Sequence, residues 1–369
     1  MRTLMHGFHI AFFGSSLVSA YWNGAATYYR GLLRALHARG HQVTFYEPDA
    51  YGRQQHRDIE DPEWARVIVY RPDASGVEAA MLAARDADIV VKASGVGVND
   101  EWLEREILRL QRPGRIVAFW DVDAPATLAR LEQLPDDPFR ALIPRYDLVF
   151  TYGGGAPVVD AYSRRGARAC VPIYNAVDPD THHPVSPDVR FAGTLNFLGN
   201  RLPDREARVR EFFLKPAAML SGRRFCLGGS GWDESAQPSA NVHVIGHVYS
   251  HEHNAFNCSA MAVLNVNRES MARTGYSPAT RIFESAGAGA CIISDAWQGI
   301  EEFLEPEREV LLASNGDEVL HHVQRLGRRT AAAIGTAARR RVLARHTYAH
   351  RAAQVEQVLQ GRVRPEAAA

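Results

Sequence analysis

Residues 262–293 have the sequence AVLNVNRESMARTGYSPATRIFESAGAGACII. The segment opens with an apolar run and closes with a second one, and short apolar runs of this kind are typical of buried strands. Between the two runs, Gly275 provides a permissive turn, while Ser277 and Pro278 are typical of the N-cap and the first position of a helix. The order strand, helix, strand predicts a βαβ unit of a parallel sheet.

The predicted start of this helix has the features of an anion site. The first N–H groups of a helix lack partners, and the helix dipole favours negative charge at that end. Glu284 lies seven residues after Ser277, about two turns along, so both project from nearly the same helix face. A carboxylate placed there accepts hydrogen bonds from vicinal hydroxyls such as those of a ribose. The segment therefore indicates a nucleotide-sugar site that includes Tyr276, Ser277, Pro278, Ala279, Thr280 and Glu284.

The same alternation of strands and helices extends over the chain on both sides of this segment. Strands are predicted at 9–13, 42–46, 88–92, 115–120 and 147–151, and in the second half at 189–193, 224–227, 242–246, 262–266, 290–293 and 310–312. Helices are predicted at 26–36, 76–84 and 100–110 in the first half. This pattern predicts an α/β fold with two Rossmann-like domains facing across a cleft, with ligands beyond the carboxyl ends of the strands.

The length of the chain fits two domains. A chain of 369 residues is longer than one usual core supports. The predicted bounds are 1–172 for the first domain, 173–188 for a proline-punctuated hinge and 189–346 for the second domain. A C-terminal helix over 347–363 is expected to pack back on the first domain.

The composition is that of an ordinary globular enzyme. The 42 basic and 42 acidic residues give a formal net charge of zero, so no global charge attracts nucleic acid or anionic lipid. All basic residues except Lys92 and Lys215 are arginines, so phosphate recognition depends on arginine forks and backbone amides. Four widely spaced cysteines and the lack of a membrane-spanning apolar run predict a cytoplasmic protein, with at most peripheral membrane contact through the basic C-terminal helix.

Three segments resemble a known family. They are Tyr28 to Leu36 with the following GHQV, the linker YNAVD at 174–178, and the segment 257–295, in which AVLNVNR is followed by GYSP and RIFE. Together they resemble the GT-B glycosyltransferases of group 1, nearest to the spore-maturation CgeB-like branch. This resemblance implies transfer of a glycosyl group from a nucleotide-diphosphate sugar, without a cofactor or a metal.

The resemblance also implies roles for individual residues. Group-1 enzymes commonly carry two glutamates spaced Glu-x7-Glu, of which the second binds the ribose; Glu284 matches the second position, whereas Tyr276 occupies the first. Arg201, Arg205 and Arg268 lie where the family places groups that bind the diphosphate, with ordinary surface arginines as the alternative. 

The resemblance places the nucleobase near His247 and Val248, which follow a predicted strand and would contact the base through backbone groups. An ordinary strand-to-loop turn is equally compatible with these two residues. Asn23 and Gly24 end the first βα loop, where glycine allows close approach of phosphate or acceptor. A simple helix-entry turn is again the alternative.

Two carboxylates are candidates for catalysis. Asp121 and Asp123 follow the predicted strand at 115–120 and share one face of an extended chain, which suits a general base or acceptor binding. In the alternative interpretation, Asp123 caps the next helix. The pairs His182-His183 and His251-Glu252-His253 have no second ligand set at a recognisable spacing, so we expect structural or surface histidines and no metal site.

Three functions fit these observations. The first is a glycosyltransferase acting on an acceptor that is a glycan, a lipid, a natural product or a protein. The second is a non-hydrolysing nucleotide-sugar epimerase, which has the same two-domain fold. The third is a catalytically inactive nucleotide-sugar-binding protein, because Tyr276 replaces a carboxylate that contacts the sugar in the family.

Overall fold

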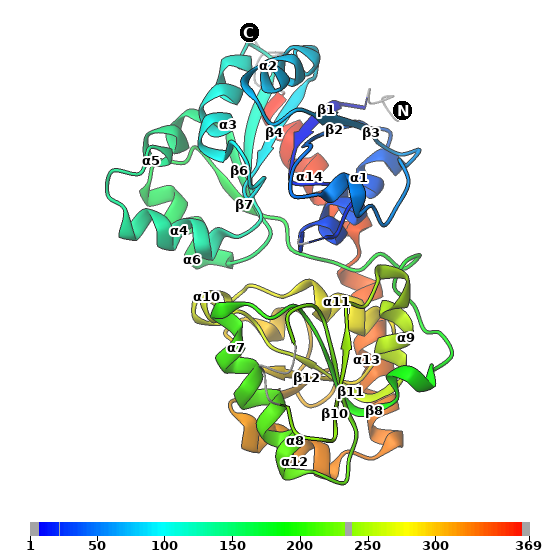
Figure 1. Cartoon of the computed structure of the whole chain (residues 1–369). Coiled ribbons are helices and arrows are strands. Elements are labelled where there is room, and N and C mark those ends of the chain that lie inside the picture. Colours follow the sequence, from blue (N-terminus) through cyan, green and yellow to red (C-terminus); the bar gives the residue numbers. More distant parts are fainter. Residues whose placement is uncertain (1–6, 22, 233–237, 364–369) are drawn as a thin grey trace, which may run out of the picture. The chain divides into compact units, whose positions relative to one another are not determined.

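The structure is a computed structural model that describes residues 7–21, 23–232 and 238–363 (Figure 1). The chain forms two compact units. Unit 1 takes the chain up to Tyr174 and again from Tyr348, and unit 2 is Asn175–Thr347.

Unit 1 is a seven-stranded sheet covered by helices. Its strands are β1 (His9–Phe13), β2 (Gln42–Pro48), β3 (Arg66–Tyr70), β4 (Ile89–Ala93), β5 (Ile116–Asp121), β6 (Leu148–Thr151) and β7 (Cys170–Pro172). Its helices and 3₁₀ turns are α1 (Ala26–Ala38), η1 (Arg53–Gln55), α2 (Ala74–Ala83), α3 (Asp100–Glu106), η2 (Ile107–Leu110), α4 (Ala124–Gln133), α5 (Phe139–Leu142), η3 (Ile143–Arg145), α6 (Gly155–Arg164) and α14 (Tyr348–Val363). The strand order is β3-β2-β1-β4-β5-β6-β7, and all pairs are parallel.

Unit 2 has a six-stranded sheet built in the same way. Its strands are β8 (Gly193–Leu198), β9 (Phe225–Gly228), β10 (Val242–Gly246), β11 (Ala260–Asn265), β12 (Ile292–Asp295) and β13 (Leu311–Ala313). Its helices and turns are η4 (Val189–Phe191), α7 (Pro203–Val209), the π-turn η5 (Arg210–Leu214), α8 (Lys215–Met219), η7 (Ser250–Glu252), α9 (His253–Cys258), α10 (Glu269–Thr274), α11 (Thr280–Gly287), η8 (Ile300–Glu302), α12 (Gly316–Arg325) and α13 (Arg328–Arg345). The order is β10-β9-β8-β11-β12-β13, again parallel throughout.

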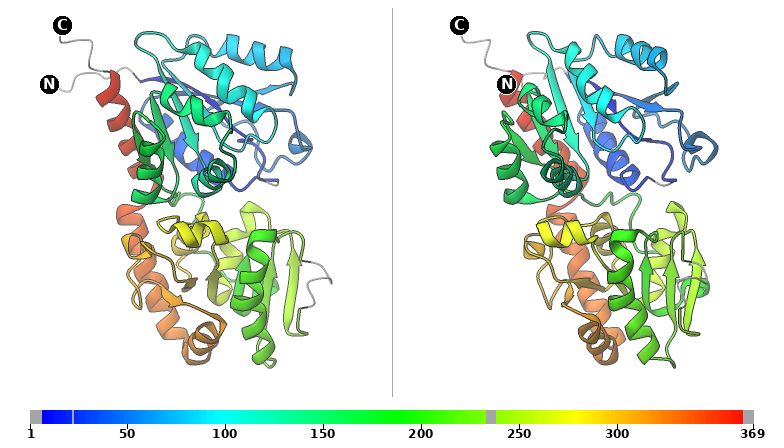
Figure 2. Two further views of the ribbon diagram at one scale, coloured as in Figure 1. Left: turned by 90° about the vertical axis from the view of Figure 1, so that its left-hand side faces the viewer. Right: turned by 60° about the vertical axis from the view of Figure 1, so that its left-hand side comes forward.

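The central strands of each sheet are buried on both faces, because the crossovers between them place helices on both sides. The views in Figure 2 show helices on both sides of each sheet. Strands such as β4 and β5 are buried at every position, as the apolar runs in the sequence predict. The prediction of two α/β units with parallel sheets is confirmed.

One predicted strand is wrong. Residues 189–191 form η4, and the first strand of unit 2 begins at Gly193. The turn forms because the Asp188 carboxylate accepts a hydrogen bond from the backbone N–H of Arg190 at 2.9 Å. The strand itself was hidden in the sequence by Asn196, a buried polar residue whose amide donates to the carbonyls of Phe191 and Phe256.

Strand β3 and helix α10 are among the elements that were not predicted. Strand β3 lies at the edge of its sheet, with Arg66 and Val69 exposed, and no strand was predicted at its apolar residues 67–70. Helix α10 has only six residues, and Gly275 follows its last residue. The sequence therefore favoured a loop in this place.

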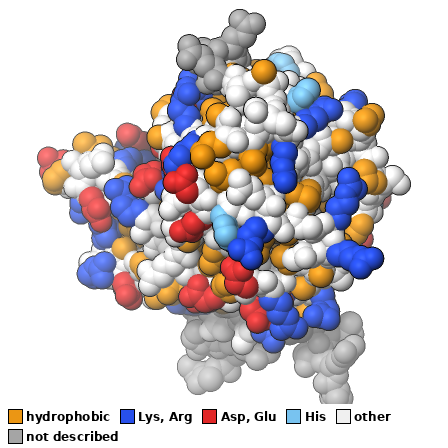
Figure 3. Space-filling model, turned by 90° about the horizontal axis from the view of Figure 1, so that it is seen from below, with side chains coloured by type: hydrophobic (Ala, Val, Ile, Leu, Met, Phe, Trp, Pro, Cys, Tyr) orange, Lys and Arg blue, Asp and Glu red, His pale blue; other side chains and the backbone are white. Residues whose placement is uncertain are grey.

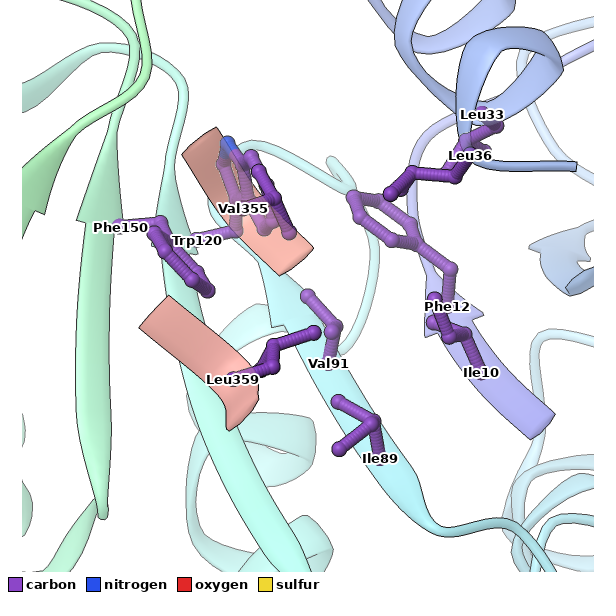
Figure 4. A pocket seen from close by; sticks show the side chains of 10 residues that line it. All are labelled: Ile10, Phe12, Leu33, Leu36, Ile89, Val91, Trp120, Phe150, Val355 and Leu359. Atoms are coloured by element: carbon purple, nitrogen blue, oxygen red, sulfur yellow. The ribbon is translucent and has the colours of Figure 1, made fainter. Parts of the chain in front are cut away.

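Helix α14 packs into unit 1 beside α1, although the two are far apart in sequence. Figure 4 shows Val355 and Leu359 of α14 facing apolar side chains of α1 and the sheet around a small gap in the core. The residues around this gap are Ile10, Phe12, Leu33, Leu36, Ile89, Val91, Trp120, Phe150, Val355 and Leu359. An apolar lining of this kind offers no group for chemistry.

Acidic and basic side chains both occur across the face shown in Figure 3, in keeping with the zero net charge. Within the described part of the chain, no helix has both the length and the apolar character needed to cross a membrane.

Candidate functional site

The strand order of unit 2 reverses between β8 and β11. In open parallel sheets this switch point leaves a crevice beyond the carboxyl ends of the strands, where ligands bind. Strand β8 ends at Leu198 and is followed by Gly199, and β11 ends at Asn265. The candidate site therefore lies around these two strand ends.

Arg281 bridges the two strand ends. Its Nε donates to the carbonyl of Leu198 at 2.6 Å, and its Nη1 donates to Oδ1 of Asn265 at 3.0 Å. Arg281 lies in the first turn of α11, so the positive end of this helix also lies near the switch point. Burial lowers the pKa of Arg281 to about 10, which leaves the guanidinium charged at neutral pH.

A second guanidinium lies beside the first. A Cβ added to Gly199 would stand 2.8 Å from Nη2 of Arg281 and 3.1 Å from Nη2 of Arg205. Both groups lie over the ring of Phe197, at 5.0 and 5.8 Å from its centroid. Burial, and then the charge of Arg281, lower the pKa of Arg205 to about 9. Two partly buried like charges repel each other, and a bound anion would relieve that repulsion.

Nearby carboxylates act on these guanidiniums only from a distance: Glu284 and Asp295 on Arg281, and Asp204 on Arg205. Nη2 of Arg205 donates to the carbonyl of Asn200, and its Nε is buried without a hydrogen-bond partner. Among the described residues, neither Arg205 nor Arg281 forms an ion pair, so their charge remains available to a ligand. The arrangement suits the several oxygens of a diphosphate.

A buried network orients the amide of Asn265. Its Nδ2 lies 3.3 Å from Oδ1 of Asp295, which leaves Oδ1 of Asn265 to accept from Arg281. The other oxygen of Asp295 accepts from Arg208 at 2.7 Å and from the N–H of Asn267 at 3.1 Å. Burial raises the pKa of Asp295, and the Arg208 guanidinium acts in the opposite direction.

The other two predicted arginines are paired with carboxylates. Arg201 follows β8 and makes a two-point contact with Glu206, at 2.8 and 2.9 Å. Arg268 lies just before α10 and contacts Asp204 at 2.5 Å. Both arginines are partly exposed, so a ligand would have to compete with these carboxylates for them.

The loop before α11 differs from the prediction. The helix begins at Thr280 with Ala279 as its N-cap residue, so Ser277 is not the N-cap and Pro278 precedes the helix. The Ser277 hydroxyl instead donates to the carbonyl of Gly275 at 2.9 Å, which closes the loop on itself. Because Ser277 lies outside the helix, the predicted shared face of Ser277 and Glu284 is also wrong.

Tyr276 lies in this loop in a left-handed conformation, with φ of 47°. Such a φ is uncommon for a residue with a bulky side chain and marks a constrained backbone. Its ring lies against Gly299, where an added Cβ would meet Cδ1 of Tyr276 at 2.2 Å. Its N–H donates to the carbonyl of Gln298 at 2.6 Å, so the loop is held from both sides.

We expect Gly275→Ala to destabilise unit 2 by about 1–3 kcal/mol. Gly275 has φ of 72° and ψ of −179°, and an added Cβ would lie 2.9 Å from the carbonyl oxygen of Gln298. Thermal unfolding followed by circular dichroism measures the effect. Gly222→Ala is the matched control, because an added Cβ there meets nothing within 4 Å. Equal melting temperatures for the two variants would contradict the strain at position 275.

Glu284 lies three residues after Arg281, so the two side chains are neighbours on one face of α11. Its carboxylate is buried between two histidines that sequence spacing did not connect. Nε2 of His182 lies 3.9 Å from Oε1 of Glu284, and Nδ1 of His253 lies 3.9 Å from Oε2. The fold thus brings together two histidines that were expected to be structural or surface residues.

The predicted nucleobase contacts lie at the end of β10. Gly246 ends the strand with φ of 78°; His247 is exposed and Val248 is buried. The His247 ring meets the exposed Tyr249 edge-on at 4.6 Å between centroids, and Tyr249 stacks with His251 at 5.8 Å. The loop thus presents aromatic side chains as well as backbone groups.

In unit 1, Asn23 holds its own loop together. Its Nδ2 donates to the carbonyls of Ser16 and Ser19, and its Oδ1 accepts from Ser15 at 2.9 Å. An added Cβ at Gly24 would meet nothing within 4 Å, so no close contact within the described structure requires glycine there. These contacts favour the helix-entry interpretation of both residues.

Asp121 is enclosed in unit 1 with no exposed surface. Its Oδ1 accepts from Ser94 at 2.8 Å and from Thr127 at 3.0 Å, and its Oδ2 accepts from Tyr162 at 2.5 Å. Burial raises its pKa. Asp121 therefore does not lie at an open strand end as expected, and its contacts organise the turn between β5 and α4.

Asp123 occupies the N-cap position of α4, as the capping alternative expects, but its side chain makes no capping hydrogen bond. Its N–H donates to Oδ1 of Asp121 at 3.1 Å.

Sequence reasoning missed Arg281, Asn265, His182 and His253. For Arg281 a signal was present, since it stands three residues before Glu284 on the same helix. The two histidines lie 71 positions apart in the chain, and no spacing rule connects residues at such a separation.

Comparison with known proteins fits this geometry. Residues 205–357 match the model of a family described as glycosyl transferase-like. The matched segment runs from α7 into α14 and includes Arg268, Arg281 and Glu284. No curated protein sequence matches the chain significantly.

Solved structures share the fold over nearly the whole chain. A sucrose-phosphate synthase from Thermosynechococcus elongatus superposes with a TM-score of 0.68 at 16% identity, covering 96% of this chain and 98% of that chain. HepE from Anabaena, in complex with UDP and glucose, gives a TM-score of 0.66 at 13% identity, covering 96% and 100%. An alpha-glucosyltransferase in complex with UDP-glucose and DNA gives a TM-score of 0.71 at 11% identity, covering 96% and 100%.

At these identities the structural likeness shows the fold alone, and the family match adds the glycosyl transferase-like character of residues 205–357. The chain therefore shares its fold with these solved structures and resembles glycosyl transferase-like proteins over residues 205–357.

Proposed function

We propose that the protein transfers a glycosyl group from a nucleotide-diphosphate sugar to a separate acceptor. The observation that carries this proposal is the convergence of Arg205 and Arg281 beside Gly199, at the switch point of unit 2. Two adjacent guanidiniums at this position suit a diphosphate, and Glu284 follows one turn later on the same helix face.

Each part of the donor has a proposed binding group. Arg205 and Arg281 hold the diphosphate, and Arg201 and Arg268 border it once released from their carboxylate partners. Glu284 accepts the ribose hydroxyls, and the segment Gly246 to Val248 contacts the base through its backbone. Tyr276 and the loop up to Thr280 border the sugar. HepE and the alpha-glucosyltransferase are described in complex with UDP or UDP-glucose, which supports a nucleotide sugar as the donor class here.

The chemistry needs charge stabilisation above all. The bond between the anomeric carbon and the diphosphate oxygen breaks, and a bond to the acceptor oxygen forms. The acceptor proton passes to the departing diphosphate, whose negative charge the two guanidiniums stabilise in an enclosed site. We propose that transfer proceeds this way without a catalytic metal. The motif from Ala262 to Glu284 also supports the CgeB-like branch as the nearest relatives.

A panel of nucleoside diphosphates tests the donor site through thermal unfolding. One of them is expected to stabilise the protein, by about 2.7 kcal/mol when present at about 100 times its Kd. For a unit of this size, each kcal/mol raises the melting temperature by about 2–4 °C. The matching nucleoside monophosphate should stabilise less, because it presents fewer charged oxygens to Arg205 and Arg281.

The same ligands separate the rival functions. If no nucleoside diphosphate raises the melting temperature, the donor site is disproved. If the matching sugar nucleotide is converted into its epimer, the epimerase interpretation is correct. Binding with no product in the presence of a broad set of acceptors identifies a non-catalytic binding protein.

A further inference from the structure

Three potential metal ligands converge in unit 2 from separate parts of the chain. His182 precedes β8, His253 is the first residue of α9, and Glu284 lies in α11. One ligand atom from each lies within 4.8 Å of the other two. The side chains are 8%, 19% and 10% exposed, so the group is largely sheltered from water.

The outer nitrogen of His182 is already occupied. Nδ1 of His182 and the Thr181 hydroxyl are hydrogen-bonded at 2.9 Å. When Nδ1 carries the ring proton, Nε2 has a lone pair, and Nε2 is the atom that faces Glu284.

His253 provides the second imidazole of the group. Its ring is 19% exposed and comes from the first residue of α9, so the start of this helix places the ring beside Glu284. Nδ1 is the nitrogen that faces Glu284. Metal-binding histidines typically have their second ring nitrogen tied to a carbonyl or a similar acceptor, which fixes the ring and its tautomer.

The facing atoms of the three side chains are too far apart for hydrogen bonds to one another. Both nitrogens lie 3.9 Å from the carboxylate oxygens, which is longer than a hydrogen bond. With neutral rings, two lone pairs and a carboxylate face the same small volume. A cation in that volume would satisfy all three groups at once.

We propose that His182, His253 and Glu284 form a binding site for a transition-metal dication, with Zn²⁺ as the best match. Two imidazoles and one carboxylate, with a fourth position open, is a ligand set that Zn²⁺ uses. Ligands at about 2.0–2.2 Å from one zinc ion stand roughly 3.4 Å apart, so small side-chain rotations close the site. Mg²⁺ prefers oxygen ligands in octahedral geometry and does not fit.

The site has a consequence for donor binding, and this consequence rests on the proposed function. Glu284 is the group proposed to accept the ribose hydroxyls, so a metal ion bound to its carboxylate competes with the nucleotide. By linkage, the nucleotide weakens metal binding by the same factor. The metal acts as an inhibitor of donor binding and takes no part in the transfer.

The test uses the full chain after treatment with a chelator. Co²⁺ is added and the visible absorption bands of tetrahedral cobalt are recorded, and Zn²⁺ is then titrated to displace it. Isothermal titration calorimetry measures Zn²⁺ and Mg²⁺ directly. We expect one Zn²⁺ per chain, loss of the cobalt bands on zinc addition, and no Mg²⁺ binding at this site.

Variants with neighbouring controls locate the ion. His182→Ala and His253→Ala should each lower Zn²⁺ affinity tenfold or more, whereas His183→Ala and His251→Ala, at exposed neighbouring positions, should leave it unchanged. Circular dichroism verifies folding, and His182→Gln and His253→Gln replace any alanine variant that unfolds. Equal losses of Zn²⁺ affinity in all four alanine variants, or no Zn²⁺ binding by the wild type, would disprove the metal site.

Separate titrations keep the two proposals apart. If the wild type binds a nucleoside diphosphate but no Zn²⁺, the metal site is wrong and the donor site stands. If it binds Zn²⁺ but no nucleotide, the reverse holds. If both bind and added Zn²⁺ leaves the nucleotide Kd unchanged, competition at Glu284 is disproved.

Discussion

Arg281→Ala is expected to lower the affinity for the donor nucleoside diphosphate by about ten- to hundredfold. Nε and Nη1 of Arg281 are fixed by Leu198 and Asn265, which leaves Nη2 beside Gly199 for the diphosphate. One hydrogen bond to a charged group contributes about 1.5–3 kcal/mol, and about 1.4 kcal/mol corresponds to a factor of ten. Calorimetric titration of wild type and variant with the stabilising nucleotide measures the loss.

Controls separate binding from folding in this experiment. Arg281→Lys keeps the charge but not the fork, so its affinity should fall between those of wild type and Arg281→Ala. Arg308→Ala removes an exposed arginine paired with Glu305 and should bind like wild type. Gly199→Ala keeps both arginines in the sequence but adds a Cβ only 2.8 Å from Nη2 of Arg281, which must shift, and it should also weaken binding. Wild-type affinity in Arg281→Ala would exclude the proposed diphosphate site.

Glu284→Gln is expected to reduce the preference for a ribonucleotide over its 2′-deoxy analogue, which in the wild type should be about tenfold or more. The carboxylate accepts hydrogen bonds from two hydroxyls, whereas the amide is neutral and presents an NH₂ group in place of one acceptor oxygen. Titration of both proteins with both nucleotides, in the presence of a chelator, measures the four affinities.

Pyrophosphate is a control ligand for the Glu284→Gln experiment. It has no ribose, so its affinity should be similar in wild type and Glu284→Gln. Glu301→Gln changes an exposed glutamate of unit 2 and should keep the ribose preference. An unchanged ratio in Glu284→Gln would remove Glu284 from the ribose site.

The fold was predictable from the sequence because it depends on local patterns. Apolar runs of four to six residues marked most strands, and their alternation with helices implied parallel sheets. The prediction failed where burial and polarity disagree. Asn196 is polar in a buried strand, so β8 did not show the expected run.

The site was less predictable because it depends on distances through space. The sequence singled out Glu284 and Arg205 as candidates. It also placed the helix start at Ser277 and predicted that the anion binds at that helix start. In the structure, the side chain of Arg281 connects α11 to the ends of β8 and β11, which no local pattern reveals. Asp121 shows the opposite error, since a carboxylate at a strand end was expected to be open and is enclosed by three hydroxyl donors.

The most direct test of glycosyl transfer is release of nucleoside diphosphate from a panel of nucleotide sugars, measured for wild type and Arg281→Ala with and without a chelator. We predict slow release from one donor by the wild type in water, faster release with an acceptor, no loss of release when a chelator is present, and release reduced at least tenfold in Arg281→Ala. Release from no donor, or equal release by both proteins, would contradict the proposed function.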